Sequence, residues 1–254
     1  MKHLMLALAL IVAPALPAAA QTDRAALAAA LQPLADKGSG EALYHLGMMR
    51  QLGIGGDQDP AAAFDLFKRA AEAGDPLGSY EYGDYFAKGD SVYVAADPAE
   101  ALKYKLIAAE AGYALAQYDV ARLYFDRDDT DNALEWLTRS AQQGHADALR
   151  ALASLHNSDA IPKDGARTYA YYTLYLRQLA APTEKQAGWL TTFAATLPPE
   201  DIERGKKIVD DWKIDVSPLT AKAASGLRAA VSLVTPPART RLKSKSAAKP
   251  KVKR

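Results

Sequence analysis

Small and apolar residues recur at fixed distances from four glycines along the chain. Gly38, Gly74, Gly112 and Gly144 are separated by 36, 38 and 32 residues. A small residue lies four positions after each glycine and another lies five positions further on: Ala42 and Gly47, Gly78 and Gly83, Ala116 and Ala121, Ala148 and Ala153. A repeat of this length predicts stacked pairs of helices, with the small residues at close helix crossings.

Capping residues delimit the second helix of each unit. Asp59, Asp97 and Asp129 precede three of these helices, and an aspartate side chain can accept a free backbone N–H there. Each helix is predicted to end at the next repeat glycine, because glycine adopts the left-handed cap conformation without a steric penalty. The loop from Gly53 to Asp59 is rich in glycine, but no strand precedes it and no Lys-Ser/Thr follows it, so it is not predicted to bind phosphate.

The chain is therefore predicted to be all-α, a right-handed α-solenoid of stacked antiparallel helix pairs. The predicted organisation is a signal peptide (1–20), an N-terminal capping helix (21–38), four repeats (39–180), C-terminal capping helices (181–216), a further helix (217–234) and a disordered basic tail (235–254). Gly226 weakens the prediction of a helix in 217–234.

The first unit resembles a known repeat. It contains Leu46-Gly47, Gly53, Gly55, Asp59 and Ala63, followed by Lys68-Arg69-Ala70-Ala71-Glu72-Ala73-Gly74; the third contains Ala116-Gln117-Tyr118 and Glu135-Trp136. On these residues, the chain resembles the Sel-one-like repeat family, a branch of the tetratricopeptide-type α-solenoids, over about residues 38 to 180. The resemblance implies a scaffold that binds proteins, and exported bacterial members of this family include regulators that restrain membrane sensor kinases.

The first twenty residues predict export. Lys2 and His3 precede an apolar run from Leu4 to Val12, and Ala18-Ala19-Ala20 forms an A-x-A cleavage site. The run is about half the length of a membrane-spanning helix, which needs roughly 20 residues. We expect cleavage near Ala20 and a periplasmic or secreted protein; an uncleaved membrane anchor is the alternative.

Charge is distributed unevenly along the chain. Residues 21–215 carry all 30 acidic residues and 20 of the 31 basic ones, a net charge of −10, whereas the tail after Thr235 has eight basic residues and no acid. The tail is predicted to bind an anionic envelope polymer (peptidoglycan, acidic polysaccharide or lipid phosphate), or else to lie on its own acidic body. Nucleic acid is not an expected partner, because export removes it from reach.

The sequence predicts no catalytic residue, metal site or cofactor, and therefore no enzyme. It has no cysteine, which excludes disulfides, thiolate metal sites and a cysteine nucleophile. His45, His145 and His156 lie in no metal-binding motif. The acidic stretch that starts at Asp126 lacks the glycine and glutamate of a Ca²⁺ loop, so Asp129 is interpreted as a helix cap.

The first helix of each unit is expected to line the concave face of the solenoid, where such proteins bind partners. The residue three before the second small residue of each unit is a tyrosine or arginine, the types that dominate interface hot spots. The candidate binding residues are these four, Tyr44, Tyr80, Tyr118 and Arg150, and their neighbours His45, Glu81, Asp119 and Arg122, which are expected to be more open. The alternative is that the tyrosine rings pack between helices. We predict a periplasmic, non-enzymatic scaffold or regulatory adaptor for a protein or peptide partner, with a membrane sensor as one candidate.

Overall fold

The computed structural model describes residues 18–88 and 92–235 of the chain. The predicted signal peptide up to residue 17 and the basic tail from residue 236 lie outside the described residues. Within them, the chain forms thirteen α-helices and no strand, which confirms the all-α prediction. None of the described helices is both long enough and apolar enough to cross a membrane.

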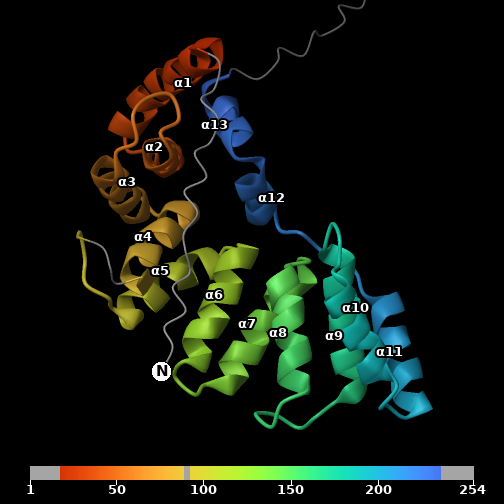
Figure 1. Ribbon diagram of the computed structural model, residues 1–254. Coiled ribbons are helices and arrows are strands. Elements are labelled where there is room, and N and C mark those ends of the chain that lie inside the picture. Colours follow the sequence, from red (N-terminus) through yellow and green to blue (C-terminus); the bar gives the residue numbers. More distant parts are fainter. Residues whose placement is uncertain (1–17, 89–91, 236–254) are drawn as a thin grey trace, which may run out of the picture.

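Four antiparallel helix pairs form the body of the molecule (Figure 1). We call the first helix of each pair helix A and the second helix B. Helix α1 (Ala18–Asp36) precedes the pairs, which are α2 (Gly40–Leu52) with α3 (Pro60–Glu72), α4 (Pro76–Lys88) with α5 (Pro98–Glu110), α6 (Ala114–Phe125) with α7 (Thr130–Gln142), and α8 (Ala146–His156) with α9 (Gly165–Gln178). Each helix packs mainly on its neighbours in sequence, as in a solenoid.

The predicted caps are confirmed. Asp59, Asp97 and Asp129 each accept a hydrogen bond from a backbone N–H in the first turn of α3, α5 and α7. The four repeat glycines have φ between 78° and 94°, and the chain reverses at each of them from one helix into the next. These turns depend on local chemistry alone, and they fix where every pair begins and ends.

Small residues allow helices to approach closely, both between neighbouring pairs and within a pair. A Cβ atom added at Gly78 of α4 would lie 2.3 Å from Cβ of Ala70 in α3, closer than two carbon atoms can approach. A Cβ atom at Gly47 of α2 would lie 2.6 Å from the ring of Phe67, which is fully buried. The small residues of the repeat are therefore sites of helix contact, as the pattern predicted.

The C-terminal part of the chain does more than cap the solenoid. Helices α10 (Glu184–Ala194) and α11 (Pro199–Asp211) pack on α9 at the far end. The chain then returns across the open side of the arc as residues 212–235, which we call the strap (Figure 1). The strap contains α12 (Pro218–Ser225) and α13 (Leu227–Val234), and α13 packs on α1 and α2.

Two details of the strap differ from the sequence prediction. The single helix expected in 217–234 is two short helices, because Gly226 lies between them with φ of 54°. Residues 212–216, expected within the capping helices, form no helix, and the backbone N–H of Asp215 donates to the carbonyl of Gln142 at 2.9 Å.

Candidate functional site: the helix A groove

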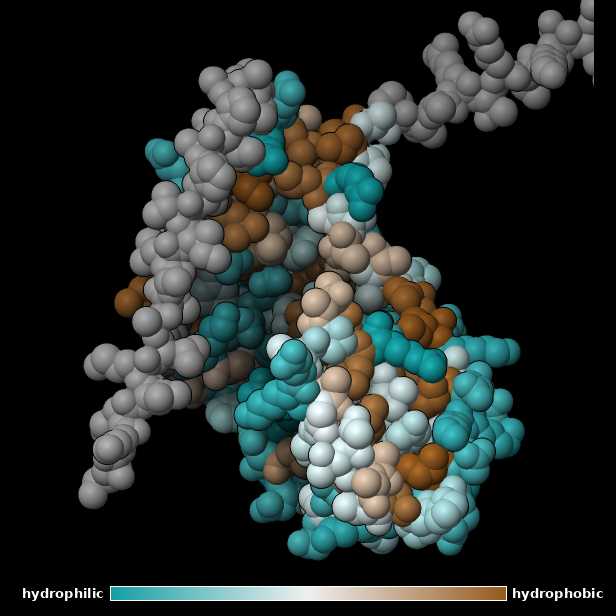
Figure 2. All heavy atoms as spheres, turned by 45° about the vertical axis from the view of Figure 1, so that its right-hand side comes forward, coloured by the Kyte–Doolittle hydropathy of each residue, from teal (hydrophilic) through white to brown (hydrophobic). Residues whose placement is uncertain are grey.

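The inner face of the arc is formed by the A helices. Figure 2 shows this region hollowed, with many hydrophilic side chains along it. Three hollows follow one another along the A helices, and together we call them the helix A groove. The N-terminal hollow lies between α2 and α4, the middle hollow between α4 and α6, and the C-terminal hollow beside α8.

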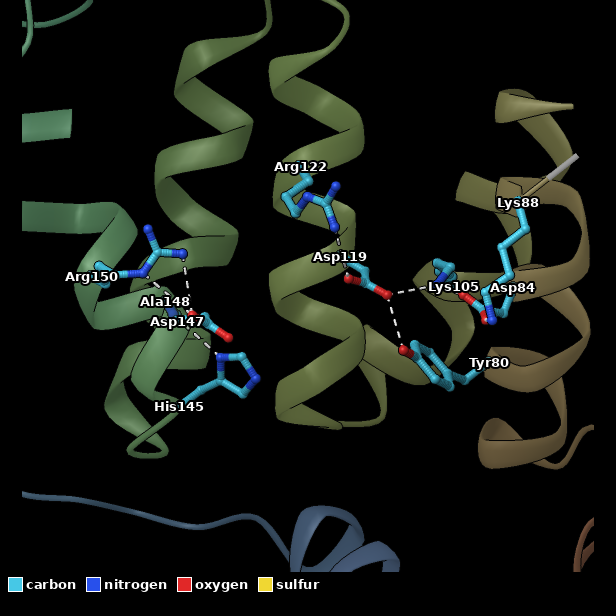
Figure 3. A network of polar contacts seen from close by, with 10 residues as sticks. All are labelled: Tyr80, Asp84, Lys88, Lys105, Asp119, Arg122, His145, Asp147, Ala148 and Arg150. Carbon is cyan, nitrogen blue, oxygen red and sulfur yellow. Dashed lines mark hydrogen bonds and ion pairs between the residues drawn. The ribbon is translucent and has the colours of Figure 1, made fainter. Parts of the chain in front are cut away.

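The middle hollow, of about 280 Å³, is built around a buried lysine (Figure 3). The side chain of Lys105, from α5, is 2% exposed, and its Nζ donates to Asp84 of α4 at 2.9 Å and to Asp119 of α6 at 2.6 Å. The hydroxyl of Tyr80 donates to Asp119 at 3.0 Å, and Nζ of Lys105 lies 4.3 Å from the centre of the Tyr80 ring. This network joins three consecutive helices by buried charge.

Electrostatics in the middle hollow favour the charged form of Asp84. Burial would raise the pKa of this carboxyl, but the charge of Lys105 and hydrogen bonds from Lys88 and Lys105 offset burial and hold the pKa below its usual value. Further out, Arg122 is 65% exposed and lies 4.0 Å from Asp119. The hollow therefore has a floor of two carboxylates that share one buried cation, and a rim of exposed basic side chains.

The N-terminal hollow, of about 310 Å³, contains an unusual carboxyl group. Burial, with the charge of Asp84 adding to it, raises the pKa of Glu81 to about 7. The hollow is also lined by Gln51, Tyr85 and Tyr93. Near neutral pH, Glu81 therefore exists in both its charged and its neutral form.

The C-terminal hollow, of about 370 Å³, combines one arginine with aromatic rings. Arg150 lines it and forms an ion pair with Asp147 at 3.2 Å (Figure 3). Tyr172 and Trp189 form the opposite wall, with ring centres 4.3 Å apart, and Trp189 is 38% exposed. An arginine facing partly exposed aromatic rings is a typical composition for a protein-binding surface.

In the first unit, the candidate residues line none of these three hollows. Tyr44 and His45 are buried, and the expectation that His45 is open is wrong. The strap packs on this end of α2, where Lys222 forms an ion pair with Glu41 at 2.6 Å. Burial, together with the charge of Lys222, lowers the pKa of His45 against the opposing effect of Glu41, which lies 3.8 Å away.

The remaining candidates fall into two groups. Tyr80 is buried and Tyr118 half-buried, with the Tyr118 ring 5.0 Å from that of His145, so these two rings pack within the fold. The groove-lining candidates are Glu81, Asp119, Arg122 and Arg150. The structure thus distributes these four over three hollows along one face.

Sequence reasoning missed Lys105, although a signal was present. Lys105 lies seven residues before Gly112, and the matching positions before Gly74 and Gly144 are Phe67 and Leu137, both fully buried. A lysine at a core position of the repeat requires buried partners. Asp84 and Asp119, on the flanking A helices, supply them.

Comparison with known families agrees with this geometry. The family model of the Sel1 repeat matches residues 40–75, 76–113, 114–145 and 146–174, more than half of the chain and all four helix pairs. The chain belongs to the Sel1 repeat family. Sel1 repeat proteins, the Sel-one-like repeats of the sequence analysis, are typically non-catalytic and mediate protein–protein interactions.

Several solved structures resemble the chain. A Sel1 repeat protein from Oxalobacter formigenes has 22% identity and a TM-score of 0.56, covering 71% of this chain and 76% of that one. A protective antigen of uropathogenic Escherichia coli with an SLR fold has 17% identity and a TM-score of 0.45, covering 88% and 52%. The immunity protein Pa5087 from Pseudomonas aeruginosa has 18% identity and a TM-score of 0.44, covering 82% and 89%. No curated protein matches the chain.

Proposed function

We propose that the protein is an exported, non-enzymatic scaffold or regulatory adaptor that holds a segment of a partner protein in the helix A groove. One observation supports this proposal most strongly: three consecutive A helices each place an aspartate beside a basic residue along the groove. The pairs are Asp84 with Lys88, Asp119 with Arg122 and Asp147 with Arg150.

Such pairs are suited to recognition. Their basic side chains are between 48% and 65% exposed, and exposed ion pairs contribute only about 0–1 kcal/mol to stability. A partner can therefore re-pair these charges at little energetic penalty, while the aromatic wall of the C-terminal hollow offers apolar contact. The alternating charges fit an extended segment that carries residues of both signs.

The test is a pull-down from envelope extract with the mature protein, followed by mass spectrometry. We expect Arg122→Glu with Arg150→Glu to lose specific partners that the wild type retains. Arg139→Glu is the matched control, because Arg139 is also 48% exposed and ion-paired but lies on a B helix, α7. Equal recovery with the groove variant and the control would refute binding in the groove.

Export is the second part of the proposal and rests on the first twenty residues. A periplasmic address would bring the groove within reach of the outer portion of a membrane sensor, the class of partner that the family resemblance suggests. An envelope protein recovered in the pull-down, and lost with the groove variant, would support this partner class.

The alternative function, attachment to an anionic envelope polymer, is favoured by one observation. Every residue after Asp215 is uncharged or basic, and the described chain ends at Thr235, beside the strap's contact with α1. The pull-down is therefore repeated with residues 235–254 deleted, together with cosedimentation on purified envelope at low and high salt. Binding that is insensitive to both the deletion and the salt would refute attachment by the tail.

A further inference from the structure

The strap packs against one face of α1 and α2 at the N-terminal end of the groove, and we call this face the seat. Helix α13 places Ala230, which is fully buried, and Ala229 against the apolar side chains of α1 and α2. Leu227 and Val234 flank them at helical spacing, whereas Val231 is 46% exposed. The occupant is therefore a short amphipathic helix with small residues at its centre.

Before α13, the strap is held by polar contacts and buries no residue. Helix α12 has no buried residue, and residues 213–216 of the connection are all exposed. Its polar contacts gather at two turns of the solenoid: Asp215 N–H donates to the carbonyl of Gln142, Ser217 donates to the carbonyl of Gly112 at 2.7 Å and through its N–H to Gln143, and Thr220 donates to Gln143 at 2.7 Å and accepts from the N–H of Ala114. Further along, Lys222 pairs with Glu41. Two helices of eight residues, broken at Gly226, are too short to be stable when detached.

The seat continues the groove. His45 holds the same repeat position on α2 as Glu81 holds on α4, but His45 is buried beside Lys222 of the strap, whereas Glu81 lines the open N-terminal hollow. We propose that this face of α1 and α2 is a binding site for a short amphipathic helix of a partner, which the chain's own strap occupies at rest and the partner's helix displaces.

Competition by the strap has a measurable consequence. A tethered occupant acts at an effective concentration of the order of millimolar, so it lowers the apparent affinity for any external helix. If the seat is vacant in only about 1% of molecules, a variant with an open strap binds an external helix about a hundredfold more tightly. This inference does not require that the open hollows bind anything, so it can fail without refuting the proposed function.

The first experiment uses a fluorescent peptide of residues 217–235 as the external helix and measures anisotropy with the full-length protein. Ala230→Glu places a charge at the buried centre of the seat, and the matched control, Val231→Glu, places the same charge at the exposed neighbouring position. We expect Ala230→Glu to bind the peptide at least tenfold more tightly than the wild type or the control. A peptide that itself carries Ala230→Glu is expected not to bind.

Equal affinity for all three proteins would overturn the proposal. Light scattering is run in parallel, and a dimer formed by wild-type chains that exchange straps would also overturn it, because the seat would then serve self-association. Global unfolding of Ala230→Glu in circular dichroism would show that the strap is an integral part of the fold, the third refuting result.

The second experiment measures strap opening without disturbing the seat. The chain has no cysteine, so one introduced thiol reports on one position. Ala230→Cys is compared with Ala148→Cys, which is equally buried but lies in the core of the helix pairs. We expect a thiol reagent under native conditions to modify Ala230→Cys at least tenfold faster, because local opening precedes global unfolding. Equal rates would overturn the proposal.

Discussion

Replacing Lys105 with leucine tests whether buried charge holds the middle of the solenoid together. The substitution leaves Asp84 and Asp119 facing each other without their shared cation, with side chains only 22% and 18% exposed. Removing one partner of a buried ion pair destabilises by about 3–5 kcal/mol. The exposed charges of Lys88 and Arg122 and the burial of leucine, worth roughly 1.5–3 kcal/mol when complete, offset part of this loss.

We therefore expect Lys105→Leu to lower the free energy of unfolding by about 1–3 kcal/mol at pH 7, or the melting temperature by about 2–10 °C. The assay is urea denaturation followed by circular dichroism. Lys103→Leu on the same helix is the control, because Lys103 is 59% exposed and forms an exposed ion pair with Glu100, and it should produce no measurable change.

The pH dependence separates charge from packing. In the wild type, the lowered pKa of Asp84 stabilises the fold above the pKa of the unfolded state, and this contribution is lost as the pH falls through the folded-state pKa. In Lys105→Leu that contribution is already absent, so the difference between the proteins should shrink as the pH falls below 3.8 and through the folded-state pKa of Asp84. Adding Asp84→Asn and Asp119→Asn should restore most of the stability at pH 7. A deficit that is unchanged in acid and not rescued by the two amides would refute the electrostatic explanation.

Three further predictions concern other parts of the chain. Because the pKa of Glu81 is raised to about 7, the stability of the wild type should fall as the pH rises from about 4.5 to 7. Urea denaturation at pH 8 should therefore find Glu81→Gln more stable than the wild type by about 1–3 kcal/mol. An equal or lower stability of the variant would contradict the burial of a titrating carboxyl. Gly78→Ala should destabilise by about 1–3 kcal/mol, because its Cβ would overlap Ala70, whereas Gly188→Ala on α10, where a Cβ meets nothing within 4 Å, should stabilise by roughly 0.5–1 kcal/mol; melting curves compare the two directly. Mass spectrometry of fractionated cells should find the mature protein starting at Gln21, and an intact Met1 in the cytoplasm would contradict export.

The helix pairs and their register follow from local sequence patterns. Asp59, Asp97 and Asp129 cap helices through bonds to their own next turn, and the repeat glycines reverse the chain because of their own backbone freedom. Such signals act within a few residues, so they can be recognised in the sequence before the fold is known. The family and the general kind of function followed from the same pattern.

Which parts of the predicted groove are open depends on contacts between segments that are distant in the sequence. His45 occupies the same repeat position as Glu81, yet His45 is buried beside a segment nearly 180 residues away, around Lys222, whereas Glu81 lines an open hollow. Lys105 likewise acquires its role from Asp84 and Asp119 on two other helices. A repeat pattern predicts which side chains each unit can place on its surface. Contacts between distant segments depend on how the solenoid curves and on where its C-terminal segment returns, and the local spacing of residues does not encode these two features.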